Sequence, residues 1–198
     1  FDPIHYGHIK PVINVQTKHK LEKIYYVPIN QHNFDKSIIA TPEQRVEMLR
    51  LSLEDKSHII DDREINRSGT SYTHDTILSI KKINQGSVLY LIIGMDNLKQ
   101  FHRWHQCRKI LEECNVIVMH REYKEKCDDY IIHSTLSKHL TDSRSIFNKS
   151  SYGKIFIEDT CLINISSSEV REKLKNKQTI RDLVHPELSK YLLSNHIY

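Results

Sequence analysis

Residues 88–93 form the segment that most constrains the fold of this chain. Their sequence, Val-Leu-Tyr-Leu-Ile-Ile, is a continuous apolar run that ends at Gly94. An unbroken apolar run of this length is typical of a strand covered on both faces, as in a parallel sheet, whereas a strand with one solvated face alternates apolar and polar residues. The run therefore predicts a strand inside a parallel sheet.

Strand-like and helix-like segments alternate along the rest of the chain. Further strands are predicted at residues 23–28, 57–61, 115–119 and 154–157. Helices are predicted at residues 9–20, 41–55, 72–83, 106–113, 129–139, from 166 onwards and at 186–193. Alternating strands and helices predict an α/β fold with a parallel sheet flanked by helices. Ligands of such sheets bind at the carboxyl ends of the strands.

Composition favours one continuous domain over residues 1–198. The 29 basic and 25 acidic residues leave a net charge of +4, without a long block of either sign. A general nucleic-acid binder concentrates its basic charge more than this. No apolar run is long enough to span a membrane, and the four cysteines include no C-x-x-C pair. We therefore expect a cytoplasmic protein with no nucleic-acid or membrane partner and no metal-binding residues, either a monomer or a homo-oligomer.

The first group of candidate site residues is His5-x-Gly7-His8, in the string Phe-Asp-Pro-Ile-His-Tyr-Gly-His that opens the sequence. We expect Gly7 to let the backbone fold tightly before a helix, so that the two imidazoles converge. Imidazole N–H groups donate to phosphate oxygens, and a helix N-terminus beside them favours anions. An H-x-x-H spacing alone is better explained by a surface pair of histidines, but the longer string is much more specific.

The second group lies in residues 165–171, Ile-Ser-Ser-Ser-Glu-Val-Arg. Ser166 and Glu169 fit a capping box, which requires no ligand. Arg171 is predicted to lie within the first helical turn, where a cation opposes the helix dipole unless an anion is nearby. The hydroxyls of Ser166 and Ser167, the backbone amides and the guanidinium would together cradle a phosphate. Helix capping and phosphate binding both remain open for this motif.

The third group follows the apolar run. The strand ends in Gly94-Met95-Asp96, which places the Asp96 carboxylate at the rim where α/β sheets bind ligands and where it can accept hydrogen bonds from a ribose. The only tryptophan, Trp104, follows closely, and an indole there can stack on a flat ring. The structural alternatives are that Asp96 caps the next helix and that Trp104 covers the core.

Two weaker candidates precede this group. Ser71-Tyr72-Thr73 begins a predicted helix with Thr73 as its cap, and it can offer hydroxyls and amides to a ligand. Residues 30–36, which begin with Asn30, follow a predicted strand as a binding loop would. Simple helix capping and solvated loop charges explain these two segments equally well.

In their order and spacing, these motifs resemble the bacterial nicotinate-mononucleotide adenylyltransferases, within the HxGH nucleotidyltransferase superfamily. The resemblance runs nearly from end to end, up to the closing Asn-His-Ile-Tyr of residues 195–198. It implies a Rossmann-like fold and the transfer of an adenylyl group from ATP to nicotinate mononucleotide, which forms deamido-NAD and pyrophosphate. It also implies that Mg²⁺ acts together with ATP, and that positioned donors do the work of catalysis without a protein nucleophile.

The resemblance implies a set of ATP-binding residues. His5 and His8 would contact the ATP phosphates and the transition state, and they are the candidate catalytic residues. Arg171, with Ser166 and Ser167, would hold the β- and γ-phosphates.

The resemblance also implies a set of residues for the acceptor nucleotide. Asp96 would bind ribose and Trp104 would stack on the pyridine ring. Tyr72 and Thr73 would hold the nicotinate end, partly through backbone amides that suit a carboxylate better than a carboxamide, and Asn30 would also contact substrate.

Two departures from the family pattern stand out. Family members usually begin with a short apolar strand and Gly-Gly-Thr/Ser before the Phe, so we expect the first strand of the sheet to be missing and the domain to be clipped at its N-terminus. The loop after the second strand often carries Pro-Pro-His-Lys, whereas residues 31–36 read Gln-His-Asn-Phe-Asp-Lys. Either His32 or Lys36 is a candidate for the phosphate-binding role of that loop.

Four alternatives remain beside the leading interpretation. Pantetheine-phosphate adenylyltransferases are usually shorter and lack the Trp104 segment. An adenylyltransferase specific for nicotinamide mononucleotide is a second alternative within the superfamily. A non-catalytic nucleotide-binding protein would bind nucleotide without releasing pyrophosphate. A fragment of a class I tRNA synthetase would need a Lys-Met-Ser-Lys-Ser-like loop and an anticodon-binding domain, and the sequence has neither.

Overall fold

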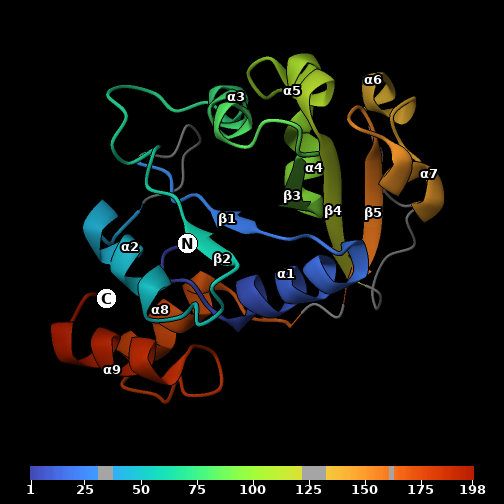
Figure 1. Cartoon of the computed structure of the whole chain (residues 1–198). Helices are drawn as coiled ribbons and strands as arrows, with labels where there is room; N and C mark the ends of the chain where they lie inside the picture. Colours follow the sequence, from blue (N-terminus) through green and yellow to red (C-terminus); the bar gives the residue numbers. More distant parts are fainter. Residues whose placement is uncertain (31–37, 122–132, 161–162) are drawn as a thin grey trace. The chain divides into compact units, whose positions relative to one another are not determined.

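The structure is a computed structural model of the chain, and it describes residues 1–30, 38–121, 133–160 and 163–198 (Figure 1). Two compact units make up the chain: the first unit comprises residues 1–71 and 163–198, and the second comprises residues 72–162. The interpretation of residues 1–198 as a single domain stays a prediction.

The first unit combines a parallel pair of short strands with helices from both ends of the chain. Strands β1 (Ile24–Tyr26) and β2 (His58–Ile60) pair with Ile24 opposite His58. The helices are α1 (Tyr6–His19), α2 (Pro42–Arg50), α8 (Ser167–Lys175) and α9 (Pro186–Asn195). Each of these elements overlaps a segment predicted from the sequence.

Helix α2 begins as its sequence predicts. The Thr41 hydroxyl accepts a hydrogen bond from the Gln44 backbone N–H at 3.2 Å, and the Gln44 side-chain oxygen accepts one from the Thr41 N–H at 2.8 Å. This reciprocal capping box satisfies two donors that the helix itself leaves unpaired. Pro42 occupies the first helical position, where its missing N–H has no cost. The helix ends at Arg50, about five residues earlier than predicted.

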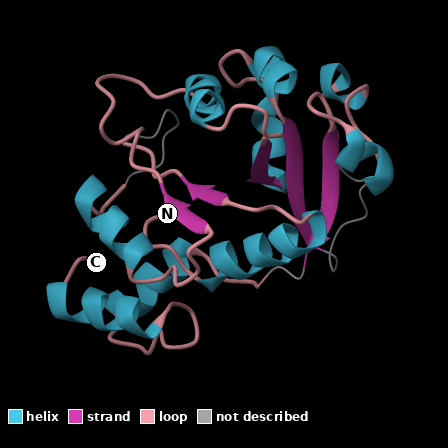
Figure 2. Ribbon diagram, viewed as in Figure 1, coloured by secondary structure: helices cyan, strands magenta, loops and turns pink. Residues whose placement is uncertain are grey.

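The second unit is a three-stranded parallel sheet with helices packed on it (Figure 2). Its strands are β3 (Tyr90–Gly94), β4 (Asn115–Arg121) and β5 (Ile155–Thr160), in the order β3-β4-β5. Helix α4 packs on β3 and β4, and α7 packs on β5. The helices of this unit are α3 (Thr73–Ile83), α4 (Met95–Phe101), α5 (Cys107–Glu113), α6 (Ser134–Ser137) and α7 (Arg144–Lys149). Parallel strands flanked by helices confirm the predicted α/β class.

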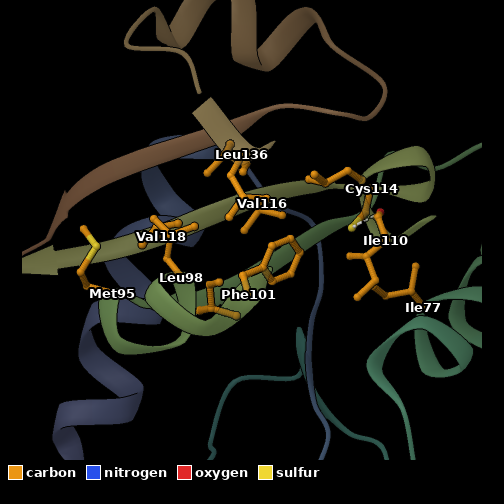
Figure 3. Close-up of a cluster of buried hydrophobic side chains, with 12 residues drawn as sticks. Ile77, Met95, Leu98, Phe101, Ile110, Cys114, Val116, Val118 and Leu136 are labelled. Atoms are coloured by element: carbon orange, nitrogen blue, oxygen red, sulfur yellow. Dashed lines mark hydrogen bonds between the residues drawn. The ribbon is translucent and has the colours of Figure 1, made fainter. Parts of the chain in front are cut away.

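The core of the second unit lies where α4 covers β4, and it includes Ile110 of α5 (Figure 3). Val116 and Val118 of β4 pack in this cluster with Leu98 and Phe101 of α4, and all four are buried. Removing a side chain of this size from water stabilises the fold by about 1.5–3 kcal/mol. Ile117, whose side chain points to the other face of β4, is also fully buried, so this strand is covered on both faces.

The strand predicted from residues 88–93 is present as β3, but its burial differs from the prediction. Tyr90, Leu91 and Ile92 are only half-buried, and Ile93 is buried. The reason is position: β3 has one neighbour in the three-stranded sheet, whereas β4 has two. Helices α4 and α7 were not predicted from the sequence. Of the helix predicted at residues 129–139, residues 129–132 lie outside the described residues.

None of the helices in the described ranges combines the length and apolar character that crossing a bilayer requires.

Candidate active site

His5 and His8 lie together at the beginning of α1. His5 is the N-cap, with extended backbone angles of φ −151° and ψ 170°, and its carbonyl accepts from the His8 N–H at 2.8 Å. This cap turns the chain so that the two imidazoles stack, with ring centroids 3.8 Å apart and an interplanar angle of 33°. The structure thus brings together the two histidines that the sequence spacing suggested would converge.

Gly7 provides the space for this arrangement. A Cβ added at Gly7 would lie 2.9 Å from Nδ1 of His5 and 3.1 Å from the carbonyl oxygen of Ile163. Distances below 3.0 Å are essentially never seen for a real Cβ, so the His5 ring or the backbone would have to move. The glycine is required here by the close approach of His5 and Ile163.

Both imidazoles are neutral at pH 7 in this setting. Burial lowers the pKa of His5 to about 4, and burial followed by repulsion from His5 lowers the pKa of His8 well below its usual value. The Nδ1 atoms of both rings are buried and have no hydrogen-bond partner within the described part of the chain. An unpaired buried polar atom is costly, so both rings are held in this position at some cost in free energy.

The start of α8 is bonded to the segment that leads into the histidine pair. Ser166 caps the helix by accepting from the Glu169 N–H at 3.1 Å, which is the serine half of the predicted capping box. The Ser167 hydroxyl donates to the Pro3 carbonyl at 2.9 Å, and Arg171 Nη1 donates to the Asp2 carbonyl at 2.6 Å. These contacts join residues 164 and 169 positions apart in the sequence.

The predicted position of Arg171 in the first helical turn is wrong. Ser167 is the first residue of α8, so Arg171 is the fifth and lies past that turn. Its guanidinium also lies 3.9 Å from the Asp2 carboxylate and donates to the Ser168 hydroxyl at 3.1 Å. The charge is therefore matched within the protein, and the unfavourable dipole does not by itself indicate a bound anion.

Asn30 contributes its backbone to the first unit. Its carbonyl accepts a hydrogen bond from Nη2 of the buried Arg45 at 3.4 Å, the long end of the range for such bonds. His32 and Lys36, the candidates for the phosphate-binding loop, lie outside the described residues.

Tyr72 and Thr73 lie at the beginning of α3 in the second unit. Thr73 was expected to cap this helix, but the cap is Tyr72 and Thr73 is the first helical residue. Tyr72 has the extended backbone that a cap needs, and its carbonyl accepts from the Asp75 and Thr76 N–H groups at 3.1 and 3.2 Å. The Tyr72 ring lies against that of His105, with centroids 4.2 Å apart.

Asp96 and Trp104 follow β3 along the chain. Asp96 is exposed and is the second residue of α4, whose N-cap is Gly94, so the alternative that Asp96 caps this helix is wrong. Trp104 is half-buried and packs against the core, with its ring centroid 5.2 Å from that of Phe101. The core-covering role proposed as an alternative for Trp104 is thus present, and the residue as a whole is only partly buried.

Two residues of the first unit that the sequence analysis did not single out are Asp2 and Tyr198. The Tyr198 hydroxyl donates to the Asp2 carboxylate at 2.7 Å, across 196 positions of sequence. Asp2 could have been singled out from the sequence, because it lies within the Phe-Asp-Pro string that precedes the histidine pair. No local sequence pattern indicates that Tyr198 is the hydrogen-bond partner of Asp2.

Comparison with known proteins decides the family. The family model described as cytidylyltransferase-like matches residues 1–173. The chain is 30% identical over 201 residues to the probable nicotinate-nucleotide adenylyltransferase of Pectobacterium atrosepticum, covering 100% of this chain and 94% of that protein. It is 33% identical over 196 residues to that of Legionella pneumophila strain Lens, covering 96% and 93%. The chain belongs to the cytidylyltransferase-like family, among the nicotinate-nucleotide adenylyltransferases.

Solved structures of adenylyltransferases share the fold of this family member. The nicotinic acid mononucleotide adenylyltransferase of Plasmodium falciparum, complexed with NaAD, has a TM-score of 0.68 at 21% identity and covers 99% of this chain and 92% of its own. A putative nicotinate-nucleotide adenylyltransferase from Vibrio parahaemolyticus has a TM-score of 0.65 at 16% identity, with 98% and 93% covered. These likenesses confirm the predicted Rossmann-like α/β fold.

Proposed function

We propose that this adenylyltransferase transfers the adenylyl group of ATP to nicotinate mononucleotide, forming deamido-NAD and pyrophosphate in NAD biosynthesis. The observation that carries the proposal is the bonding of α8, through Ser167 and Arg171, to the segment that leads into the stacked pair of His5 and His8. Two elements from opposite ends of the chain thereby bring imidazole, hydroxyl and guanidinium groups into one unit. The names of the relatives support the same reaction.

The first unit supplies the groups for the ATP phosphates. His5 and His8 are neutral, and each can donate one N–H to a phosphate oxygen. Arg171 has five N–H donors, of which the Asp2 carbonyl and the Ser168 hydroxyl use two. The remaining guanidinium donors bind the β- and γ-phosphates together with the Ser166 hydroxyl and the backbone N–H of Ser167 at the N-terminus of α8, since the Ser167 hydroxyl itself donates to Pro3.

Positioned donors are sufficient for this chemistry. An oxygen of the acceptor phosphate attacks the α-phosphorus of ATP, and the bond from that phosphorus to the bridging oxygen breaks as pyrophosphate leaves with the electron pair. The negative charge on the phosphoryl oxygens is stabilised by fixed N–H donors, and no protein nucleophile takes part. We include Mg²⁺ as part of the ATP substrate, since this ion binds readily to nucleotide phosphates and keeps several waters. Within the described residues, no group of three or more His, Cys, Asp or Glu side chains is placed to hold a metal ion.

The second unit supplies the groups for nicotinate mononucleotide. The first N–H groups of α3, at Thr73 and just after it, have no partner within the helix and favour an anion such as the nicotinate carboxylate. The accessible part of Trp104 stacks on the pyridine ring, and Asp96 accepts from the ribose hydroxyls. Tyr72 contacts the nicotinate end. Asn30 belongs to the first unit and stays a separate candidate for contact with substrate.

The preference for nicotinate mononucleotide over nicotinamide mononucleotide tests the assignment of the acceptor substrate. We expect kcat/KM with nicotinate mononucleotide to exceed that with nicotinamide mononucleotide by about tenfold or more, because a carboxylate gains from the helix N-terminus and a carboxamide does not. The measurement is pyrophosphate release from ATP with each mononucleotide, and with no mononucleotide as the control. Equal rates with acid and amide would remove the nicotinate assignment. Turnover with pantetheine phosphate alone would replace it with the related adenylyltransferase activity.

The histidine pair also predicts proton uptake when ATP binds. The free protein holds the pKa of His5 at about 4, and phosphate charges beside the ring raise that pKa. Between the free and bound values the complex binds more protons, so ATP affinity rises as the pH falls through this window, above about pH 4. Calorimetry at pH 5.5 in two buffers of different ionisation enthalpy measures the uptake. Since ATP itself titrates in this range, the control is the double variant His5→Gln/His8→Gln, and equal uptake by both proteins would refute the prediction.

A further inference from the structure

The Asp2 carboxylate connects distant segments of the first unit. Its Oδ2 accepts from the Ile39 N–H at 2.9 Å, and its Oδ1 accepts from the Ala40 N–H at 3.1 Å. Tyr198 donates its hydroxyl to Oδ1 at 2.7 Å, and Arg171 Nη1 lies 3.9 Å from Oδ2. One carboxylate thus joins the loop before α2, helix α8 and residue 198.

The Tyr198 hydroxyl is a fixed donor in this network. Burial, and then the hydrogen bond to Asp2, raises its pKa well above the usual range, so the hydroxyl keeps its proton. The same oxygen lies 3.7 Å from Sδ of Met48 on α2. The Asp2 side chain is only 13% exposed, so water replaces a lost donor poorly at this position.

Hydrogen bonds connect the segment that contains Asp2 to the proposed phosphate-binding groups. The Asp2 carbonyl accepts from Arg171 and the Pro3 carbonyl accepts from Ser167. Three residues after Asp2, His5 caps α1 and stacks on His8. A shift of Asp2 therefore changes the place of Arg171 and of the histidine pair.

We propose that Tyr198 is a positioning residue for ATP. Its hydrogen bond to the Asp2 carboxylate keeps the groups that bind the ATP phosphates in position. This inference rests on the proposed function only in assigning the ATP phosphates to the first unit. A purely structural role would lower stability without selective loss of one substrate. A positioning role weakens MgATP and spares nicotinate mononucleotide, whose ring and carboxylate we assign to residues of the second unit.

The test is Tyr198→Phe, which removes one oxygen atom. We expect calorimetry to show the Kd for MgATP rising about five- to tenfold, the scale of the net contribution of one ordinary hydrogen bond. The KM for nicotinate mononucleotide at saturating MgATP stays within twofold of wild type. The matched control is Tyr191→Phe on α9, whose hydroxyl makes no hydrogen bond within the described part of the chain, and which leaves both constants unchanged.

A second variant tests the contact itself. Asp2→Ala removes the carboxylate that accepts from Tyr198 and weakens MgATP binding. Adding Tyr198→Phe to it weakens binding little further, because both changes remove the same hydrogen bond. Additive losses, an unchanged MgATP Kd in Tyr198→Phe, or equal weakening of both substrates would overturn the proposal. If the wild type forms no dinucleotide but Tyr198→Phe still loses MgATP affinity, the proposed function fails and the positioning role stands.

Discussion

His8→Ala lowers kcat for adenylyl transfer about 100-fold or more. The imidazole is a half-buried, neutral donor whose ring centroid lies 3.8 Å from that of His5, and alanine leaves no group to stabilise charge on the transferring phosphoryl group. Losing one preorganised donor of this kind costs about 10²–10³ in turnover. Pyrophosphate release at saturating ATP and nicotinate mononucleotide measures the change.

The matched control for His8→Ala is Lys10→Ala, on the same helix. Lys10 is exposed, and two residues along a helix place it on the opposite face from His8. We expect its turnover to stay within about twofold of wild type, the size of effect seen for most surface substitutions. Near-normal turnover in His8→Ala would refute the proposed role of this histidine.

Gly7→Ala both destabilises the protein and lowers turnover by at least about tenfold. The added Cβ would lie 2.9 Å from Nδ1 of His5 and 3.1 Å from the Ile163 carbonyl, so the His5 ring, which we propose is catalytic, has to move. Overpacking of this kind costs about 1–3 kcal/mol of unfolding free energy, and a donor displaced by as little as 1 Å loses much of its effect.

The sign of the change in unfolding free energy of Gly7→Ala distinguishes this prediction from the usual effect of the substitution. Within a helix, alanine is otherwise more stable than glycine by about 0.5–1 kcal/mol. Urea unfolding of Gly7→Ala therefore separates the two accounts: a lower unfolding free energy supports the close approach of Gly7 and His5, and an equal or higher one contradicts it.

The elements with strong local signals were predicted well from the sequence. Thr41, Pro42 and Gln44 determine the beginning of α2 through bonds made within one turn, and the structure has them as predicted. The apolar run of β4 is likewise explained by burial on both faces. Helix α3 begins one residue away from the expected cap, since Tyr72 rather than Thr73 caps it. Helix α8 begins at the expected cap, Ser166, but Arg171 is its fifth residue and lies past the first turn.

The candidate site was predictable only in its local parts. The spacing of His5, Gly7 and His8 determines whether two rings can stack, because all three lie within one turn. The contacts of Asp2 with Arg171 and Tyr198 span 169 and 196 positions, and no periodicity or spacing encodes such a pairing. These contacts depend on how α8 and the end of the chain pack on residues 1–5.

The most direct test of the central claim follows the α-phosphorus of ATP. The protein is incubated with ATP labelled at the α-phosphate and with nicotinate mononucleotide, and the products are separated. Our account predicts that the label appears in deamido-NAD, with one unlabelled pyrophosphate released for each dinucleotide formed. Label in AMP or ADP, or pyrophosphate released without a dinucleotide, would contradict it.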